Sequence, residues 1–142
     1  MPKVKVEETK LVAGDNAKVY KILAETEHHR RILPEAFVDY KEESDGTISY
    51  GIVYGGMRRN FTATVERVEE NKLLREIQLP TQAVTDFVLE DHPDGTLVTI
   101  RSEYDTPNTP AGWLEAKVAP SFMHKLFDEE LTKLARYVLT VQ

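Results

Sequence analysis

The side chains of this sequence best suited to recognising a small molecule are two tyrosines and one arginine near its middle. Tyr50 and Tyr54 alternate with smaller residues, and Arg59 follows across the Gly55-Gly56 pair. The tyrosine hydroxyls can hydrogen-bond a ligand, or the rings can pack in the core with their hydroxyls at its rim. Arg59 can bind a carboxylate or phenolate, pair with an acidic residue, or lie at the surface. The sequence leaves these alternatives open.

The four histidines do not form a recognisable metal or acid–base motif. Histidines that hold a metal or move protons must converge, and no HExxH spacing is present. His28 and His29 are adjacent, so on a helix their side chains diverge by about 100°. His92 falls in a turn, and His124 lies off the apolar stripe of its helix. We therefore predict no metal, no cofactor and no catalytic residue.

Cysteine, carboxylates and glycines add no catalytic motif either. The chain has no cysteine, which excludes disulfides, thiolate ligands and a cysteine nucleophile. Asp86 and Glu103 fall in late strands, where we expect them to be solvated or to pair across strands with residues such as Arg101. Gly55-Gly56 is far more typical of a hairpin turn than of a nucleotide phosphate loop.

Length and charge limit the kind of protein that carries these side chains. The chain has 142 residues, which predicts a single domain over residues 1–142. Its 24 acidic and 18 basic residues give a net charge of −6, which argues against a basic nucleic-acid-binding face. No apolar run approaches the roughly 20 residues that span a bilayer, and the first residues lack a signal core. We expect a cytoplasmic protein without stable membrane insertion.

The N-terminal elements are predicted to be a strand and two short helices. Residues 4–12 alternate valine with charged residues, as a half-buried strand does. Asp15 or Asn16 can then cap a helix that runs to about Glu25. Thr26 can cap a second short helix, which we expect to end at residue 33, because the next residue is a proline.

The middle of the chain predicts six strands in an antiparallel meander. Segments 48–54 and 61–66 alternate clearly, and residues 97–104 complete the set. Short turns between adjacent strands imply antiparallel neighbours. The turn signals are Asp45-Gly46, Gly55-Gly56, Glu70-Asn71, Leu79-Pro80-Thr81 and Asp94-Gly95.

A long amphipathic helix is predicted at the C-terminal end. Pro120 suits its first turn, and a shorter helical piece is possible from Gly112. Its apolar residues recur at steps of three and four: Met123, Phe127, Leu131, Leu134, Val138 and Val141.

This order of elements resembles the START/Bet v 1-like superfamily (SRPBCC), and within it the polyketide cyclase/dehydrase-like branch. Three segments carry the likeness: residues 13–20 after the first strand, residues 94–99 at the last hairpin, and residues 113–120 leading into the long helix. The resemblance implies an α+β helix-grip fold. In that fold a seven-stranded curved antiparallel sheet wraps around the C-terminal helix, with two short helices after the first strand.

Simple dimensions indicate why such a fold leaves an internal space. Seven strands at about 4.8 Å span roughly 34 Å, whereas one helix is only about 10–12 Å across. The sheet must therefore curl, and we expect a cavity of at least about 300 Å³ beneath it. Alternation and the helical stripe predict its ligand-binding lining: Tyr50, Ile52, Tyr54, Arg59, Phe61, Ala63, Ile77, Phe87, Tyr104, Trp113, Met123 and Phe127.

Three functions are compatible with this sequence. The first is binding of a small hydrophobic ligand, lipid-, aromatic- or polyketide-like, in the cavity. The second, which the resemblance allows, is a polyketide cyclase/aromatase-like or dehydratase-like enzyme. The third is a chaperone-like or stress-related interaction protein with a vestigial cavity. The missing acid–base pair favours binding over catalysis. We expect a monomer or a homodimer, with no nucleic-acid partner.

Overall fold

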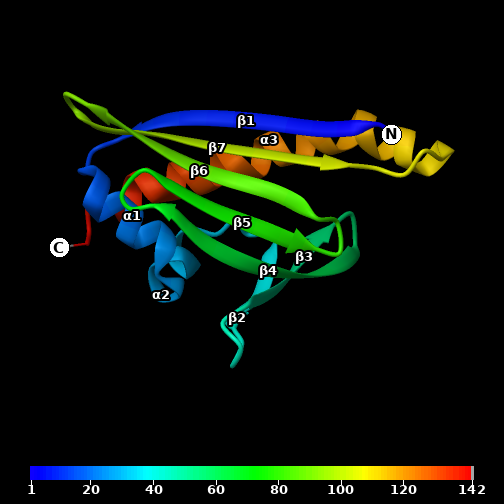
Figure 1. Cartoon of the computed structure of the whole chain (residues 1–142), viewed down its shortest axis with the longest axis horizontal. Helices are drawn as coiled ribbons and strands as arrows, with labels where there is room; N and C mark the ends of the chain where they lie inside the picture. Colours follow the sequence, from blue (N-terminus) through cyan, green and yellow to red (C-terminus); the bar gives the residue numbers. More distant parts are fainter. Residues whose placement is uncertain (142) are drawn as a thin grey trace.

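A seven-stranded antiparallel sheet curls along one long helix in the computed structural model, which describes residues 1–141 (Figure 1). The strands lie in the order β1-β7-β6-β5-β4-β3-β2, so only β1 is out of sequence. This is the helix-grip α+β fold expected from the sequence. The elements are β1 (Lys3–Val12), α1 (Asn16–Ala24), α2 (Thr26–His29), η1 (Arg30–Ile32), β2 (Phe37–Glu42), β3 (Ile48–Tyr54), β4 (Met57–Glu69), β5 (Leu73–Leu79), β6 (Ala83–His92), β7 (Gly95–Asp105) and α3 (Pro110–Tyr137).

The β3–β4 hairpin shows how local sequence sets the register. Gly55 and Gly56 form its two-residue loop with φ of 60° and 79°. Positive φ at both positions is the geometry of a type I′ turn, which glycine adopts without steric cost. The turn pairs Tyr54 with Met57 and Tyr50 with Phe61. Residues 50, 52, 54, 59 and 61 therefore share one face of the sheet, as alternation predicted.

The main hydrophobic core fills only one end of the space between sheet and helix. There, α1 packs its apolar face, including Ile22, against Leu74, Phe87 and the last turns of α3. The Asp15 side chain caps α1 by accepting a hydrogen bond from the Lys18 backbone N–H at 2.8 Å. A second, smaller cluster gathers under β3 and β4: Ile48, Tyr50, Phe61 and Ala63. The two clusters flank the pocket described below.

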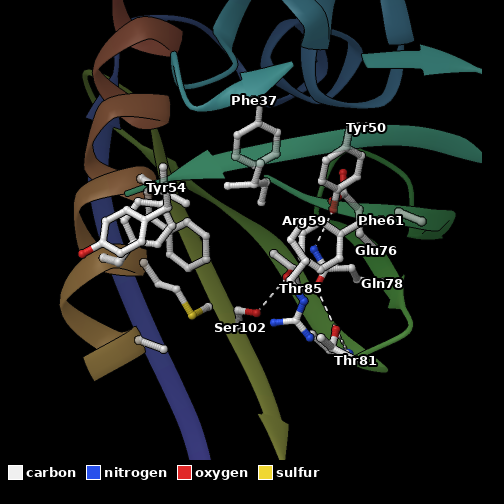
Figure 2. Close-up of a pocket in the computed structure, with 18 of the residues that line it drawn as sticks. Phe37, Tyr50, Tyr54, Arg59, Phe61, Glu76, Gln78, Thr81, Thr85 and Ser102 are labelled. Carbon is white, nitrogen blue, oxygen red and sulfur yellow. Dashed lines mark hydrogen bonds between the residues drawn. The ribbon is translucent and has the colours of Figure 1, made fainter. Parts of the chain in front are cut away.

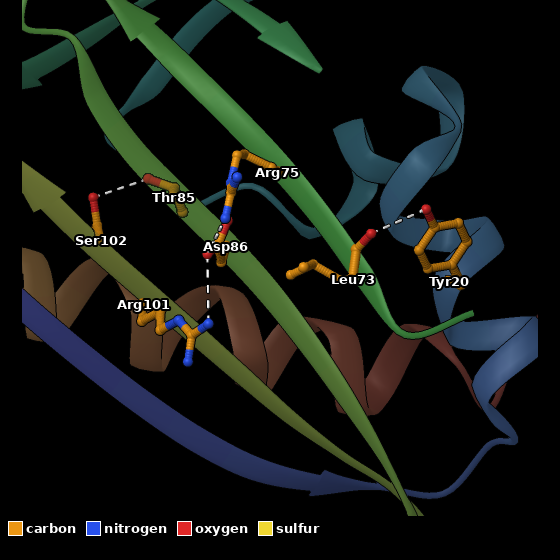
Figure 3. Close-up of polar contacts among 7 residues, drawn as sticks. All are labelled: Tyr20, Leu73, Arg75, Thr85, Asp86, Arg101 and Ser102. Carbon is orange, nitrogen blue, oxygen red and sulfur yellow. Dashed lines mark hydrogen bonds and ion pairs between the residues drawn. The ribbon is translucent and has the colours of Figure 1, made fainter. Parts of the chain in front are cut away.

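Strands β5, β6 and β7 are joined by an ion-pair network on the face that points away from the pocket (Figure 3). Asp86 on β6 accepts from Arg75 Nε at 2.8 Å and from Arg75 Nη2 at 3.2 Å. Arg101 Nη2 lies 3.6 Å from the same carboxylate. The preceding residue on β6, Thr85, points to the opposite face and donates to Ser102 Oγ at 2.9 Å. The alternation along β6 thus separates structural charges from pocket-lining groups.

Two helix boundaries differ from the sequence-based expectation. The long helix begins at Pro110, where Thr109 caps it by accepting from the Gly112 N–H, so Pro120 lies inside α3 and not in its first turn. The piece expected from Gly112 is therefore part of this one helix of 28 residues, about 42 Å long. Thr26 does not cap α2, because its hydroxyl donates to Glu42 Oε1 instead.

Candidate functional site

A pocket of about 460 Å³ lies between the inner face of the sheet and α3 (Figure 2). Strands β2 to β7 line one side of it. On the other side, α3 presents residues spaced by three and four, among them Glu115, Phe122, Leu126 and Glu130. The main core occupies the α1 end of the sheet, and the pocket lies beside it, between the smaller cluster under β3 and β4 and the facing side chains of α3.

Ten of the twelve residues predicted to bind a ligand line this pocket. They come from β3, β4, β6, β7 and α3, and the antiparallel pairing of the strands brings them to one inner face. Their role in ligand binding stays a prediction. The ten are Tyr50, Ile52, Tyr54, Arg59, Phe61, Ala63, Phe87, Tyr104, Met123 and Phe127.

Ile77 and Trp113 do not line the pocket, so their predicted positions are wrong. On β5 it is Glu76 and Gln78 that face inward, and Ile77 therefore points to the other face, beside Thr64 and Val84. Trp113 lies in the first turns of α3 because the helix begins at residue 110. Its side chain is 59% exposed, and its Nε1–H donates to Asn108 Oδ1 at 2.9 Å.

A directed chain of hydrogen bonds ends at the Tyr50 hydroxyl (Figure 2). The Ala83 N–H donates to Thr81 Oγ1, and the Thr81 hydroxyl donates to Gln78 Oε1 at 2.8 Å. Gln78 Nε2 then donates to the Tyr50 oxygen at 2.7 Å. Because that oxygen already accepts a hydrogen bond, the Tyr50 O–H proton is available to a further acceptor. Burial, with a contribution from the Glu76 charge, raises the pKa of Tyr50, which keeps the hydroxyl protonated.

His29 and Glu130 form a buried pair at the inner end of the pocket. His29 is 3% and Glu130 is 6% exposed. His29 Nδ1 lies 2.7 Å from the Leu23 carbonyl oxygen, which can only accept, so Nδ1 carries a hydrogen. Nε2 lies 3.4 Å from Glu130 Oε1. Burial alone would lower the pKa of His29, but the hydrogen bond and charge of Glu130, with the charge of Glu76, raise it to about 9.

Glu76 places a second carboxyl group at this end of the pocket. It is only partly buried by surface area, and it lines the pocket. Burial raises the pKa of Glu76, the nearby charge of His29 lowers it, and that of Glu130 raises it again. Both nitrogens of His29 are committed to Leu23 and Glu130. Within residues 1–141, therefore, His29 acts on Glu76 through its charge alone.

Arg59 and aromatic rings form the outer end of the pocket. The Arg59 guanidinium carbon lies 5.4 Å from the Phe61 ring centroid, and Nη1 lies 3.9 Å from Glu115 Oε1. Its side chain is 56% exposed. Tyr54 packs on Phe122 of α3 with ring centroids 4.1 Å apart. Arg59 lines the pocket, has an acidic neighbour and is largely exposed, which agrees with two of the alternatives left open by the sequence, pairing with an acid and lying at the surface. Its role in binding a ligand stays a prediction.

This arrangement of sheet, helix and pocket matches a known family. The sequence profile described as "Polyketide cyclase / dehydrase and lipid transport" covers residues 3–139. The chain belongs to this family, within the START/Bet v 1-like superfamily (SRPBCC). The resemblance seen in the sequence is thereby confirmed.

Several solved structures have the same fold as this family member, although their sequence identity to it is low. The KanY protein has a TM-score of 0.83 at 19% identity, covering 97% of this chain and 99% of that one. The TTHA0849 protein of Thermus thermophilus has a TM-score of 0.73 at 17% identity, covering 98% of each chain. Ara h 8.0201 has a TM-score of 0.69 at 15% identity, covering 98% and 99%. No curated protein matches the sequence significantly.

Sequence reasoning missed several polar residues of the pocket. Among them are His29, Tyr40, Glu76, Gln78 and Glu130. The sequence of β5 (Leu73–Leu79) does not show which of its two faces points inward. Arg75 and Ile77 lie on one face, Glu76 and Gln78 lie on the other, and each pair contains a charged residue. Apolar character alone favours Ile77 inward, and only the pairing with β4 and β6 decides otherwise. No local signal links His29 to Glu130.

Among residues 1–141, no three His, Asp or Glu side chains are grouped so that they could hold a metal ion. Over that range, no helix combines the length and apolar character needed to span a membrane.

Proposed function

We propose that this protein binds a small, mainly apolar molecule in the pocket between the sheet and α3. The observation that carries the proposal is the pocket itself. Its volume of about 460 Å³ falls within the range typical of small-molecule sites, roughly 300–1,000 Å³. Most of its lining is aromatic or aliphatic. Charged groups lie at the inner end, with His29, Glu76 and Glu130, and at the outer end, with Arg59 and Glu115, and the lining also includes uncharged polar side chains such as Gln78 and Ser102. This composition favours an apolar ligand whose orientation is set by its polar ends.

The energetics of the lining support the same proposal. Apolar surface removed from water contributes about 25 cal/mol per Å². A ligand that buries ~200 Å² of apolar surface would thus gain roughly 5 kcal/mol before the cost of its immobilisation. The aromatic side chains need little rearrangement, because Phe37, Tyr40 and Phe61 already pack around the Tyr50 ring at centroid distances of 5.2, 6.0 and 5.7 Å.

Filling the pocket from within tests the proposal. Ala63 is 2% exposed and lines the pocket, whereas its neighbour Thr64 on β4 points to the opposite face. Native mass spectrometry of the purified protein first identifies any bound molecule, and calorimetric titration with that molecule or with an apolar probe such as 2-ethylnaphthalene measures affinity. We expect Ala63→Phe to weaken binding at least tenfold and Thr64→Phe to leave it unchanged. Equal affinities for the two variants would refute a ligand site in this pocket.

A second candidate function is an enzyme that acts on the bound molecule. One observation favours it: the Glu76 carboxyl group faces the pocket, and burial raises its pKa, as general acids and bases often require. Chromatography combined with mass analysis of a ligand recovered after prolonged incubation distinguishes the two functions, because a ring closure without loss of water changes retention but not mass. A change in retention or mass that depends on Glu76 would support catalysis, and a ligand unchanged in both would support binding alone.

A further inference from the structure

The inward face of β5 carries polar side chains where the fold would gain more from apolar ones. Leu74 on this face is fully buried in the core, but the next two inward residues are Glu76 and Gln78. The outward residues include Ile77 and Leu79, and Leu79 is 46% exposed. Placing a partly buried carboxyl group in a mostly apolar pocket while exposing leucine lowers stability. Departures of this kind from the hydrophobic pattern are expected where function requires them.

The described residues leave the hydrogen-bonding capacity of Glu76 unused. Its pKa responds to burial and to the charges of His29 and Glu130, with no hydrogen bond contributing. His29 cannot supply one, because its two nitrogens meet Leu23 and Glu130. A partly buried carboxylate in a mostly apolar pocket is stabilised when a donor binds it, and a donor on a bound ligand can fill that role.

Among residues 1–141, the same pocket also offers a hydrogen-bond donor, the Tyr50 hydroxyl. Glu76 and Gln78 are two residues apart on one face of β5, about 7 Å along the strand. Gln78 holds the Tyr50 oxygen at 2.7 Å, so the Tyr50 O–H proton is available in the same pocket as the Glu76 carboxylate, whose charge helps to raise the pKa of Tyr50. A hydroxyl group both donates and accepts, and can therefore satisfy Glu76 and Tyr50 together. An ammonium group only donates, and a carboxylate only accepts.

We infer that the pocket selects apolar molecules carrying an alcohol or phenol group, which donates a hydrogen bond to Glu76 and accepts one from Tyr50. This inference rests on the proposed function and names the ligand class of the same site. The aromatic side chains around Tyr50 hold the apolar body, and the hydroxyl enters first, toward the His29–Glu130 pair. The pocket disfavours a carboxylate in that position, because it would face Glu76 with no proton to share.

Three probes of equal shape test the inference: 2-naphthalenemethanol, 2-naphthalenemethylamine and 2-ethylnaphthalene. Their affinities are measured by calorimetric titration for the wild type, for Glu76→Met, and for Glu66→Met as the matched control. Glu66 lies on the neighbouring strand, is exposed, and pairs with Arg75 on the outer face. Met keeps the length of Glu but cannot accept strongly from a ligand hydroxyl. Two-dimensional NMR spectra show whether the probes perturb pocket residues.

The expected result is a change in preference, not a general loss of binding. Glu76→Met should reduce the affinity for the alcohol relative to 2-ethylnaphthalene at least tenfold and raise the thermal midpoint, whereas Glu66→Met changes neither. Should Glu76→Met not fold, Glu76→Gln should shift the same ratio by a smaller factor. An unchanged ratio with both probes bound overturns the inference and leaves the proposed function intact. A change in the affinity of the amine alone, relative to 2-ethylnaphthalene, also overturns the inference. If none of the three probes binds in the pocket, the proposed function is overturned as well.

Discussion

Replacing His29 should remove much of the pH dependence of this protein's stability between about pH 6.5 and 9. His29 lies between the Leu23 carbonyl and Glu130, stacked on the Tyr40 ring at a centroid distance of 5.9 Å. Burial by itself lowers its pKa, but the carboxylates of Glu130 and Glu76 outweigh burial and raise the pKa in the folded protein from 6.5 to about 9. The unfolded chain lacks these neighbours and titrates near 6.5.

The sign and size of the effect follow from this difference. Below pH 6.5 the imidazole is protonated in both states, and its contribution to stability is fully present. Between 6.5 and about 9 only the folded state holds the proton, so the free energy of unfolding falls as pH rises. The folded and unfolded pKa values of His29 differ by roughly 2.5, and each pH unit between them is worth about 1.4 kcal/mol. The free energy of unfolding therefore falls by an amount on the order of 3 kcal/mol. The pKa of Glu76 is also raised in the folded protein, so its ionisation likewise lowers the free energy of unfolding as pH rises. This effect begins above the ordinary pKa of 4.5.

Urea unfolding at a series of pH values measures this contribution. Far-UV circular dichroism is the suitable signal, because Trp113 is largely exposed and reports weakly on the core. We expect the wild type to lose on the order of 3 kcal/mol more than His29→Gln between pH 6.5 and 9. Glu130→Gln should flatten the curve in the same way, since it removes the charge that holds the proton.

His28→Gln is the matched control for this experiment. His28 is adjacent but bonds to the Tyr137 hydroxyl at 2.7 Å, away from the His29–Glu130 pair. This variant should keep the wild-type slope even where its stability at any single pH is lower. Parallel pH curves for the wild type and His29→Gln would refute the reasoning, because they would mean that His29 does not bind its proton more tightly in the folded state.

Three further predictions concern the pocket, the outer face and one close contact. Arg59→Ala should weaken binding of an acidic or phenolic ligand by about 1.5–3 kcal/mol and leave the binding of a neutral hydrocarbon unaffected. Calorimetric titration with both ligands checks this, and an equal loss of affinity for the two would contradict an anchoring role. Asp86→Asn should lower the free energy of unfolding by about 1.5–3 kcal/mol, because it weakens the two hydrogen bonds from Arg75; an unchanged urea midpoint would contradict this. Gly112→Ala should cost about 1–3 kcal/mol in the same assay, since a Cβ there would overlap the Pro107 carbonyl, and a neutral effect would show that the backbone yields easily.

Elements with a local cause follow from the sequence alone. The Gly55-Gly56 loop adopts positive φ at both residues, so the turn sets the pairing of Tyr50 with Phe61 and the shared face of Tyr54 and Arg59. The Asp15 cap and the apolar face of α1 are equally local. These short-range rules, repeated along the chain, predicted the order of the elements and ten of the pocket-lining residues, and the family resemblance carried by that order implied the helix-grip fold.

Features that depend on distant neighbours required the tertiary structure. Both Pro110 and Pro120 are suitable helix starts, and α3 continues through Pro120, so the proline signal alone did not fix where the helix begins. Strand β5 fits either register, and its pairing with β4 and β6 turns Glu76 inward and Ile77 outward. A one-residue change of register reverses every side chain, so alternation cannot choose when both faces are mixed. The His29–Glu130 pair joins segments far apart in the chain. The pKa of His29 is raised because the hydrogen bond and charge of Glu130, with the charge of Glu76, outweigh the lowering effect of burial.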